Sequence, residues 1–269
     1  MPKVLLLWGT KMKKFNFENK IKGFDNTYFL ETSDTQNDDI KIEIKPKENI
    51  TIVELITSQK DVKREIFVGD DATLTYIKVA KSKELSNVSY KNTLGERANL
   101  NLFCFDFGSC VNKLRTTLDK EDSIFKLFCL IDLKNDSKVV NDLENEHFIK
   151  STSDIIFRHI LDDSSNSKLS MNSIVQNSAP FTKAVQNSKA ILLSDKARVA
   201  VSPFLELFVD ELEAKHGASF GDLDKDAIYY LQSRGIKEKD AKAIMLEAVR
   251  TEVYANLEDE KLIEYIKSL

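Results

Sequence analysis

The chain has 269 residues, of which 42% are hydrophobic, so it is long enough to bury a substantial core without disulfides or metals. Its 39 basic and 43 acidic residues give a formal net charge of -4, which offers no positive excess for nucleic acid or an anionic membrane. The three cysteines (Cys104, Cys110 and Cys129) are odd in number and form no CxxC pair. Neither a disulfide framework nor a zinc site is therefore favoured, and a reducing, cytoplasmic location is expected.

The N-terminal apolar run from Val4 to Trp8 is too short to span a membrane, and it lacks a small-residue cleavage site. We therefore reject a signal peptide. Met12 is followed by two lysines and could serve as an alternative start, so no structure is predicted for residues 1–11. Residues 1–39 are assigned to an N-terminal segment that is partly irregular.

From Ile40 onward, apolar and polar residues alternate, as in the segments 40–44, 50–56 and 72–79. This alternation and the β-branched content predict half-buried strands. The polar stretch 133–146 breaks the pattern and is predicted to be a solvated connection or an exposed insert. Strands resume at 155–161, 169–175, 190–193 and 205–209, which gives a β core over residues 40–221.

Similar short segments recur in this core. Leu74, Leu100, Phe125 and Ile156 occupy equivalent places, separated by 26, 25 and 31 residues. A recurrence of this kind, with no helical segment between the copies, predicts a β-solenoid whose coils stack on one another. A β-sandwich, whose short strands also recur, is the alternative.

After Gly221 the hydrophobic period becomes 3.6, which predicts a helical C-terminal subdomain over residues 222–269. Asp222 or Asp224 can cap the first helix, and Gly235 can end it. The acidic run 258–260 favours the start of the third helix. The expected apolar faces are Ala227, Ile228 and Leu231 in the first helix, Ala241, Ile244, Met245, Ala248 and Val249 in the second, and Leu262, Ile263, Ile266 and Leu269 in the third.

The stretch 191–245 carries a set of motifs in fixed order. LLSDKA at 192–197 is followed by Pro203, HGA at 216–218, GDLD at 221–224 and SRGI at 233–236. These motifs and their spacing resemble the C-terminal signature of the SufB/SufD proteins of iron–sulfur cluster assembly. The resemblance is strong over about residues 145–255 and weak before them.

The resemblance implies a right-handed parallel β-helix core followed by a helical C-terminal subdomain. It also implies a non-catalytic scaffold that pairs through its β-helix with a SufB-like paralogue or with itself, and that docks the ABC-type ATPase SufC on its C-terminal helices. No stably bound cofactor is expected, whereas a transient iron–sulfur cluster at the interface of the complex fits this role. The sequence has no phosphate-binding GxxxxGKS loop, so the ATPase activity is expected in the partner. Tyr229, Tyr230 and Arg234 are the candidates for ATPase docking, because Tyr and Arg are enriched at binding hot spots.

His216 matches the histidine of the HGA motif, which the resemblance places at the cluster-assembly interface beside a cysteine of SufB. A neutral imidazole is a good iron ligand, so His216 is also the metal-ligand candidate. The alternative is a turn histidine that holds the junction between strands and helices through a hydrogen bond. Three positions depart from SufB: Ser188 replaces its cysteine, Gly217 its glutamate and Ala214 a frequent second cysteine. These departures favour a SufD-like protein, with a SufB/SufD ancestor-type homodimer as the alternative.

The three cysteines lie in apolar contexts and are predicted to be buried small hydrophobes rather than sulfur relay sites. His147 and His159 are predicted to be surface or coil-packing residues rather than ligands. A competing function is a glycan-binding or lyase-type solenoid, which would need charged residues at equivalent positions of successive coils, and the sequence shows only scattered ones. Another is a structural dimerisation scaffold that binds SufC but no metal.

Overall fold

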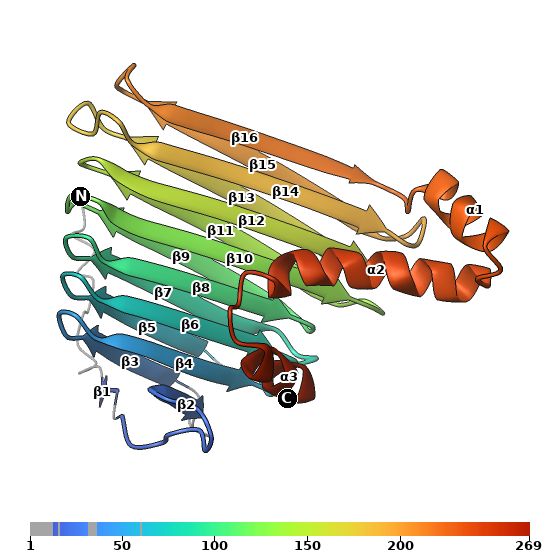
Figure 1. The fold of residues 1–269 in the computed structure, drawn as a ribbon, viewed down its shortest axis with the longest axis horizontal. Helices are drawn as coiled ribbons and strands as arrows, with labels where there is room; N and C mark the ends of the chain where they lie inside the picture. The colour runs from blue at the N-terminus through green and yellow to red at the C-terminus, as the bar shows by residue number, and fades with distance from the viewer. Residues whose placement is uncertain (1–12, 16, 32–36, 60) are drawn as a thin grey trace, which may run out of the picture.

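The computed structural model describes residues 13–15, 17–31, 37–59 and 61–269, so the prediction for residues 1–11 lies outside it. The chain folds into two eight-stranded sheets in which every neighbouring pair of strands is parallel (Figure 1). Successive strands alternate between the two sheets, so each coil contributes one strand to each sheet. This confirms a mainly β, parallel solenoid and excludes the sandwich, whose sheets would be antiparallel.

The odd-numbered sheet has the order β1-β3-β5-β7-β9-β11-β13-β15. Its strands are β1 (Lys13–Lys14), β3 (Asn37–Ile44), β5 (Asp61–Val68), β7 (Ser86–Leu94), β9 (Cys110–Leu118), β11 (Lys138–His147), β13 (Asn166–Val175) and β15 (Arg198–Leu207). The even-numbered sheet consists of β2 (Thr27–Glu31), β4 (Asn49–Ile56), β6 (Thr73–Ala80), β8 (Asn99–Asp106), β10 (Ser123–Leu133), β12 (Ser151–Leu161), β14 (Lys183–Leu192) and β16 (Glu213–Gly221). The sheets therefore begin before residue 40.

The predicted coil register holds for two of its three steps. Leu74 lies beside Leu100, and Leu100 lies beside Phe125, as predicted. Phe125 lies beside Ser153, however, and the predicted partner Ile156 is wrong. The sequence pattern misses this partner because Ser153 is a buried serine at an inward position where the pattern predicts an apolar residue.

The predicted loop at 133–146 is also wrong. Most of it is the strand β11, which pairs with β9 and β13. Its inward residues include Asn141, Asn145 and His147, all buried. Because polar side chains face the interior here, the hydropathy alternation that identifies a strand is absent.

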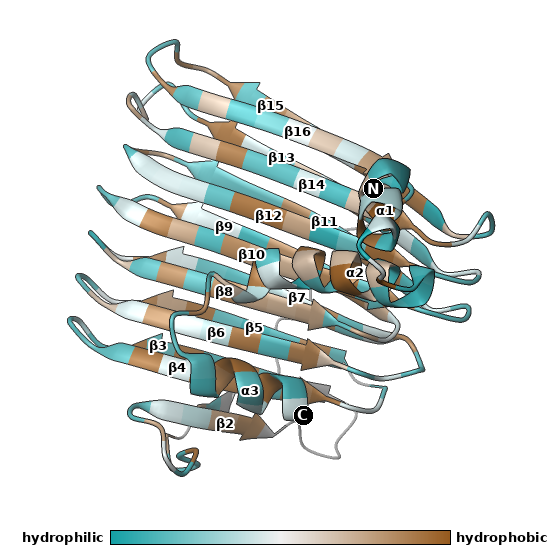
Figure 2. Ribbon diagram, turned by 45° about the vertical axis from the view of Figure 1, so that its right-hand side comes forward, coloured by the Kyte–Doolittle hydropathy of each residue, from teal (hydrophilic) through white to brown (hydrophobic). Residues whose placement is uncertain are grey.

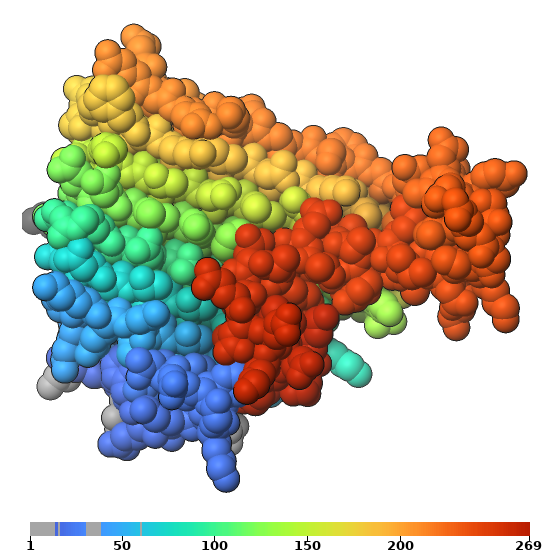
Figure 3. Space-filling view, viewed as in Figure 1, coloured from blue at the N-terminus to red at the C-terminus, as the bar shows by residue number. Residues whose placement is uncertain are grey.

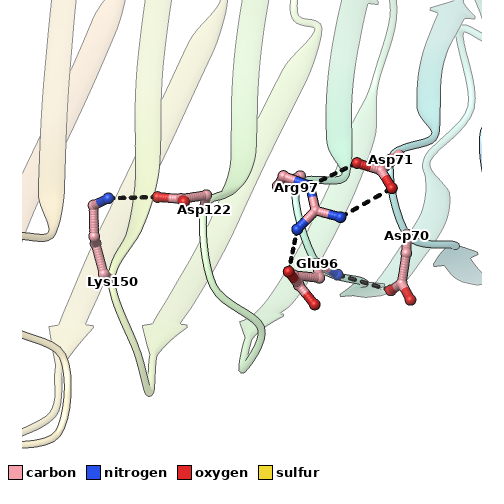
Figure 4. Close-up of polar contacts among 6 residues, drawn as sticks. All are labelled: Asp70, Asp71, Glu96, Arg97, Asp122 and Lys150. Carbon is pink, nitrogen blue, oxygen red and sulfur yellow. Dashed lines mark hydrogen bonds and ion pairs between the residues drawn. The ribbon is translucent and has the colours of Figure 1, made fainter.

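A column of left-handed turn residues closes the coils on one edge (Figure 4). Asp71, Arg97 and Asp122 have φ values of 57°, 52° and 54°, although none is glycine. The backbone N–H of Asp71 donates to the Glu96 carbonyl of the next coil, at 2.9 Å. The side chains of Asp71 and Arg97 form an ion pair with Nε···Oδ1 of 2.6 Å, and Lys150 pairs with Asp122 at 2.7 Å. These bonds between coils support a conformation that an arginine would otherwise avoid.

Three helices follow the sheets: α1 (Lys225–Ser233), α2 (Glu238–Tyr254) and α3 (Glu260–Ser268). Asp224 caps α1 as predicted, its Oδ1 accepting from the N–H groups of Asp226 and Ala227. Gly235 follows α1 with φ of 83°, which suits its predicted place after the helix end. Asp259 caps α3 in the same way as Asp224 caps α1.

The helices pack on the outer face of the even-numbered sheet rather than as a separate bundle. α2 crosses β10 and β12, and α3 lies over the first strands, beside β2 and β4 (Figures 1 and 2). A second core forms between the layers, in which the ring of Tyr254 stacks on Phe105 with centroids 4.9 Å apart. Val249, Val253, Leu262 and Ile266 are also buried there, whereas Ile244 and Ala248 are exposed, contrary to prediction.

Ion pairs and a ring contact hold this helical layer in place. Arg158 on β12 donates through Nε to Glu252 on α2 at 2.5 Å, and Arg250 on α2 pairs with Asp132 on β10 at 2.7 Å. Near the other end of the layer, the ring of Phe24 lies 5.8 Å from that of Tyr265 on α3. The C-terminal helix therefore contacts the segment that begins the solenoid.

Candidate functional site

The solenoid ends in a coil that nothing in the described chain covers. β15 and β16 are each the last strand of a sheet, so one side of each backbone has no strand partner within the described residues. The inward residues of this coil are only partly buried, as for Val201 and Leu205, whereas Leu169 of the preceding coil is 2% exposed. An unpaired strand edge beside apolar side chains is a template for association with another chain.

His216 lies on this last coil, within β16, where its neighbour in the sheet is Gln186 on β14. Gln186 is buried in the interior, and side chains at paired positions face the same side of a sheet, so His216 lies on the inner side of its sheet, in the last coil at the open end of the solenoid. The His216 side chain is exposed. The alternative of a turn histidine is therefore wrong, because the residue belongs to an edge strand.

The residues that depart from SufB are not gathered around His216 as ligands. Ser188 is buried one strand inside the edge, where its hydroxyl lies 3.2 Å from Nε2 of His159. Ala214 and Gly217 carry no ligating group. Among the residues that the structure describes, no group of three or more His, Cys, Asp or Glu side chains could hold a metal ion. His216 is therefore not part of such a group within the described residues.

The other two histidines are buried and belong to the packing between coils. His147 contacts the hydroxyls of Ser151 and Ser153 at 2.7 and 2.9 Å, and His159 contacts Ser167 at 3.0 Å. Burial lowers the pKa of His147 to about 4. Burial, together with the charge of Arg158, lowers the pKa of His159 to about 3. Both imidazoles are neutral hydrogen-bonding groups at neutral pH, which agrees with the coil-packing prediction.

The three cysteines are free thiols in the interior. Cys104 and Cys129 lie on adjacent strands in register, and each is at most 2% exposed. Burial raises the pKa of Cys110 to about 12 and also raises that of Cys129. Because the thiolate is the form that acts as nucleophile and as metal ligand, Cys110 and Cys129 are unreactive thiols in the folded chain.

The helix α1 extends beyond the ends of the strands, and none of its residues is buried (Figures 1 and 3). Tyr229 is 75% exposed and Tyr230 56% exposed. The guanidinium of Arg234 stands 5.1 Å from the centre of the Tyr230 ring, close enough for a cation–π contact. The expected burial of Ile228 and Leu231 is only partial.

A groove of about 850 Å³ is lined by residues of α1, of α2 and of the turn after β14. Tyr229 and Ile228 line it from α1, Leu246 from α2, and Leu193 from the turn. The two predicted docking tyrosines therefore differ in position, because Tyr229 borders the groove and Tyr230 stacks with Arg234.

Charged residues align on the outer face of the odd-numbered sheet, where the sequence shows only scattered ones. Lys41, Glu65, Lys91, Arg115 and Glu144 are neighbours in successive strands. Lys91 lies 3.9 Å from Glu65, and Arg115 lies 3.7 Å from Glu144. The alignment is not apparent in the sequence because the coils differ in length. The charges largely pair with one another, which is typical of a solvated face that fixes strand register.

Two buried ion pairs were not predicted. Arg64 donates to Oε1 of Glu54 through Nε at 3.1 Å and through Nη2 at 2.5 Å. Lys78 pairs with Asp106 at 2.6 Å. The sequence does indicate these pairs, because Glu54 and Lys78 occupy inward-facing positions in the apolar–polar alternation of their strands. Neither pair is near His216, so both are structural.

The described residues contain no helix that is both long enough and apolar enough to cross a membrane.

A family model described as the SufBD core domain of SUF-system FeS cluster assembly matches residues 28–249. SufD of Escherichia coli is 27% identical over 230 residues, which cover 80% of this chain and 54% of SufD. A SufBD family protein of Synechocystis is 24% identical over 197 residues, covering 70% of this chain and 43% of that protein. SufD of Bacillus subtilis is 34% identical over 101 residues, covering 37% and 23% respectively. The chain thus spans about half or less of the length of these relatives.

Proposed function

Because this chain belongs to the SufBD core domain family of iron–sulfur cluster assembly proteins, we propose that it is a SufD-like, non-catalytic scaffold of a Suf-type complex. It pairs through the open end of its solenoid with a SufB-like paralogue or with a second copy, and it docks a SufC-type ATPase on α1. A transient cluster forms at the paired ends, and the partner supplies the thiols. The complex works in the cytoplasm.

The observation that carries this proposal is the uncovered last coil. Its two edge strands offer unpaired backbone groups, and its inward apolar residues are partly exposed. A partner that continues both sheets would satisfy these groups and bury that surface. His216 would then lie inside the joint, facing the other chain, where an imidazole can add one ligand to a set of thiolates.

The exposed helix α1 supports the docking of a second partner. A nine-residue helix with no buried side chain gains little from its own chain, since short helices depend on packing for stability. Tyr229 presents most of its ring to solvent beside the groove. Burying such an aromatic against another protein supplies the type of contact that dominates binding energy.

Copurification with a SufC-type ATPase tests the docking. We expect the unaltered chain to retain the ATPase and Tyr229→Ala to weaken the complex by tenfold or more, since a hot-spot truncation costs about 2 kcal/mol or more and about 1.4 kcal/mol corresponds to tenfold. Phe67→Ala is the matched control, because Phe67 is 42% exposed on the opposite, odd-numbered sheet. Failure of the unaltered chain to bind any SufC-type ATPase would remove this part of the proposal.

Reconstitution of the cluster tests His216 separately. With a SufB-like partner present, His216→Ala is expected to lower the yield of assembled cluster while leaving the paired scaffold intact by gel filtration. Lys215→Ala is the control, since the neighbouring side chain of the same strand faces the other side of the sheet. An unchanged cluster yield in His216→Ala would exclude this residue from the assembly site.

A further inference from the structure

A file of polar side chains runs along the inner face of the odd-numbered sheet. Asn92, Thr116, Asn145 and Ser173 are neighbours on the successive strands β7, β9, β11 and β13. Each is at most 2% exposed. From the opposite sheet, Gln186 donates through Nε2 to the Ser173 hydroxyl at 2.8 Å. Because Gln186 lies beside the exposed His216, the file reaches from the middle of the solenoid to its open end.

Several atoms of this file have no hydrogen-bond partner among the described residues. At Asn145, neither the carbonyl oxygen Oδ1 nor the amide nitrogen Nδ2 has one. Asn92 donates to Thr116 at 3.1 Å, but its Oδ1 is unpartnered, and so is Oε1 of Gln186. Buried polar groups in folded proteins are almost always hydrogen-bonded to protein or to ordered water. An amide with all its donors and acceptors unused in a buried site therefore points to an internal ligand.

Asn112, in a second polar cluster of the same interior, is an amide whose donors and acceptor are all bonded to protein atoms. Asn112 donates through Nδ2 to Asp106 at 2.9 Å and to Asn141 at 2.8 Å, and its Oδ1 accepts from Lys78 at 2.8 Å. Long side chains reach Asn112 from the opposite sheet. Asn145 lies instead between Thr116 and Ser173, and neither hydroxyl bonds its amide. Thr116 accepts from Asn92, and Ser173 accepts from Gln186.

The chemistry of the file limits which ligand could bond the unpartnered atoms of Asn145. Its members are amides and hydroxyls, each able to donate and accept, and none carries a charge. A divalent cation is usually held by at least one carboxylate, and a buried anion by Lys or Arg, and the file has neither type of residue. The ligand that this chemistry favours is a neutral molecule that both donates and accepts. Water meets this description, and a buried water typically makes about three hydrogen bonds to groups that would otherwise be unsatisfied.

We propose that the solenoid interior holds ordered water bound to Asn145, between Thr116 and Ser173, and that this hydrated file continues to Gln186 at the open end. The water satisfies both amide atoms of Asn145. The far half of the solenoid thus combines this polar file with buried apolar residues such as Phe157 and Met171, whereas the first coils are filled by the large side chains of Arg64, Tyr76 and Tyr90. This site is independent of any metal or partner.

Nuclear magnetic resonance on the deuterated, ¹⁵N-labelled full chain tests the site. The side-chain amide protons of Asn145, assigned by the loss of their signal in Asn145→Gln or Asn145→Leu, are expected to show cross-relaxation with water of the sign that marks a long-lived bound molecule. The amide of Asn112 is the internal control, since its donors are used by protein oxygens and no such signal is expected. Absence of the signal at Asn145 would overturn the proposal.

Stability gives a second readout. If Asn145 is hydrated, Asn145→Leu removes ligands of the water and lowers the urea midpoint. If the site is dry, the same change removes two unsatisfied polar atoms from the core and raises the midpoint. A raised midpoint would therefore contradict the proposal, and a variant that fails to fold supports it only together with the water signal in the unaltered chain.

Discussion

The buried pair of Glu54 and Arg64 provides the sharpest test of how the solenoid interior is held together. Both side chains are completely buried, and Oε2 of Glu54 also accepts hydrogen bonds from Tyr76 at 2.7 Å and from Tyr90 at 3.1 Å. Burial, reinforced by the negative charge of Glu54, raises the pKa of both tyrosines, so their hydroxyls are neutral donors. One carboxylate thus accepts hydrogen bonds from a guanidinium and from two phenols.

Replacing Glu54 by leucine should be severe. It leaves Arg64 charged in the core, and breaking a buried pair from one side costs about 3–5 kcal/mol. Each tyrosine that loses its acceptor adds up to about 1–3 kcal/mol. Domains are stable by only about 5–15 kcal/mol, so Glu54→Leu is expected to bring the chain close to unfolding. Urea denaturation followed by circular dichroism measures this loss.

Second-site changes separate the charge from the loss of volume. Arg64→Met combined with Glu54→Leu should recover most of the stability, because no uncompensated charge remains. Adding Tyr76→Phe and Tyr90→Phe should recover the rest. The reasoning fails if Glu54→Leu costs less than about 1 kcal/mol, or if the double variant is no more stable than the single one.

Three further expectations concern pH, a helix cap and the helical layer. The pKa values of His147 and His159 are lowered by burial, to about 4 and about 3, so the unfolded chain binds more protons below pH 6.5 and the free energy of unfolding falls as the pH drops from there. By pH 5 each histidine should cost about 2 kcal/mol, measurable by urea denaturation at pH 7 and pH 5. Asp224→Ala removes the cap of α1, costs that helix about 1 kcal/mol and should speed amide exchange in α1 while β14 is unaffected. Arg158→Met removes the ion pair with Glu252, which is partly exposed, so it should destabilise the chain by at most about 1 kcal/mol and speed amide exchange in α2.

A different result would contradict each of these three predictions. A free energy of unfolding that is flat between pH 7 and pH 5 would mean that the histidines are not held neutral. Asp222→Ala is the control for the cap, because Asp222 precedes Asp224 by two residues and does not cap α1; equal effects of the two variants would argue against the capping. Unchanged exchange in α2 after Arg158→Met would show that its apolar face and the pair of Arg250 with Asp132 hold the helix without Arg158.

The sequence predicted those parts of the fold in which apolar side chains recur at inward positions. The stacking of Leu74, Leu100 and Phe125 was readable because apolar side chains fill the inward column of the first coils. The signal failed in the second half, where Asn141, Asn145 and Ser153 take inward positions and hydrogen bonds replace hydrophobic contacts. A pattern of hydropathy cannot distinguish such a strand from a polar loop.

The candidate site was also predicted only in part from the sequence. Motif spacing identified His216, but only the fold shows that it stands on an edge strand at the open end. The burial of Ser188 against His159 joins two coils and has no local sequence signal. For α2, the exposure of Ile244 depends on the direction from which the helix meets the sheet, and that direction is set by residues such as Phe105 far away in the chain.

The contact between α3 and the segment that begins the solenoid also bears on how the chain unfolds. A stack of coils in which each touches only its neighbours can fray from either end, coil by coil. Here the last helix packs over the first strands while α2 is tied to β10 and β12, so the most distant parts of the sequence are linked. Fraying of the first coils must release α3, and loss of the helical layer exposes the apolar outer face of several strands at once. The helices therefore turn a linear array into a more cooperative unit, at the expense of slower folding, since the layer can dock only after the coils beneath it have formed.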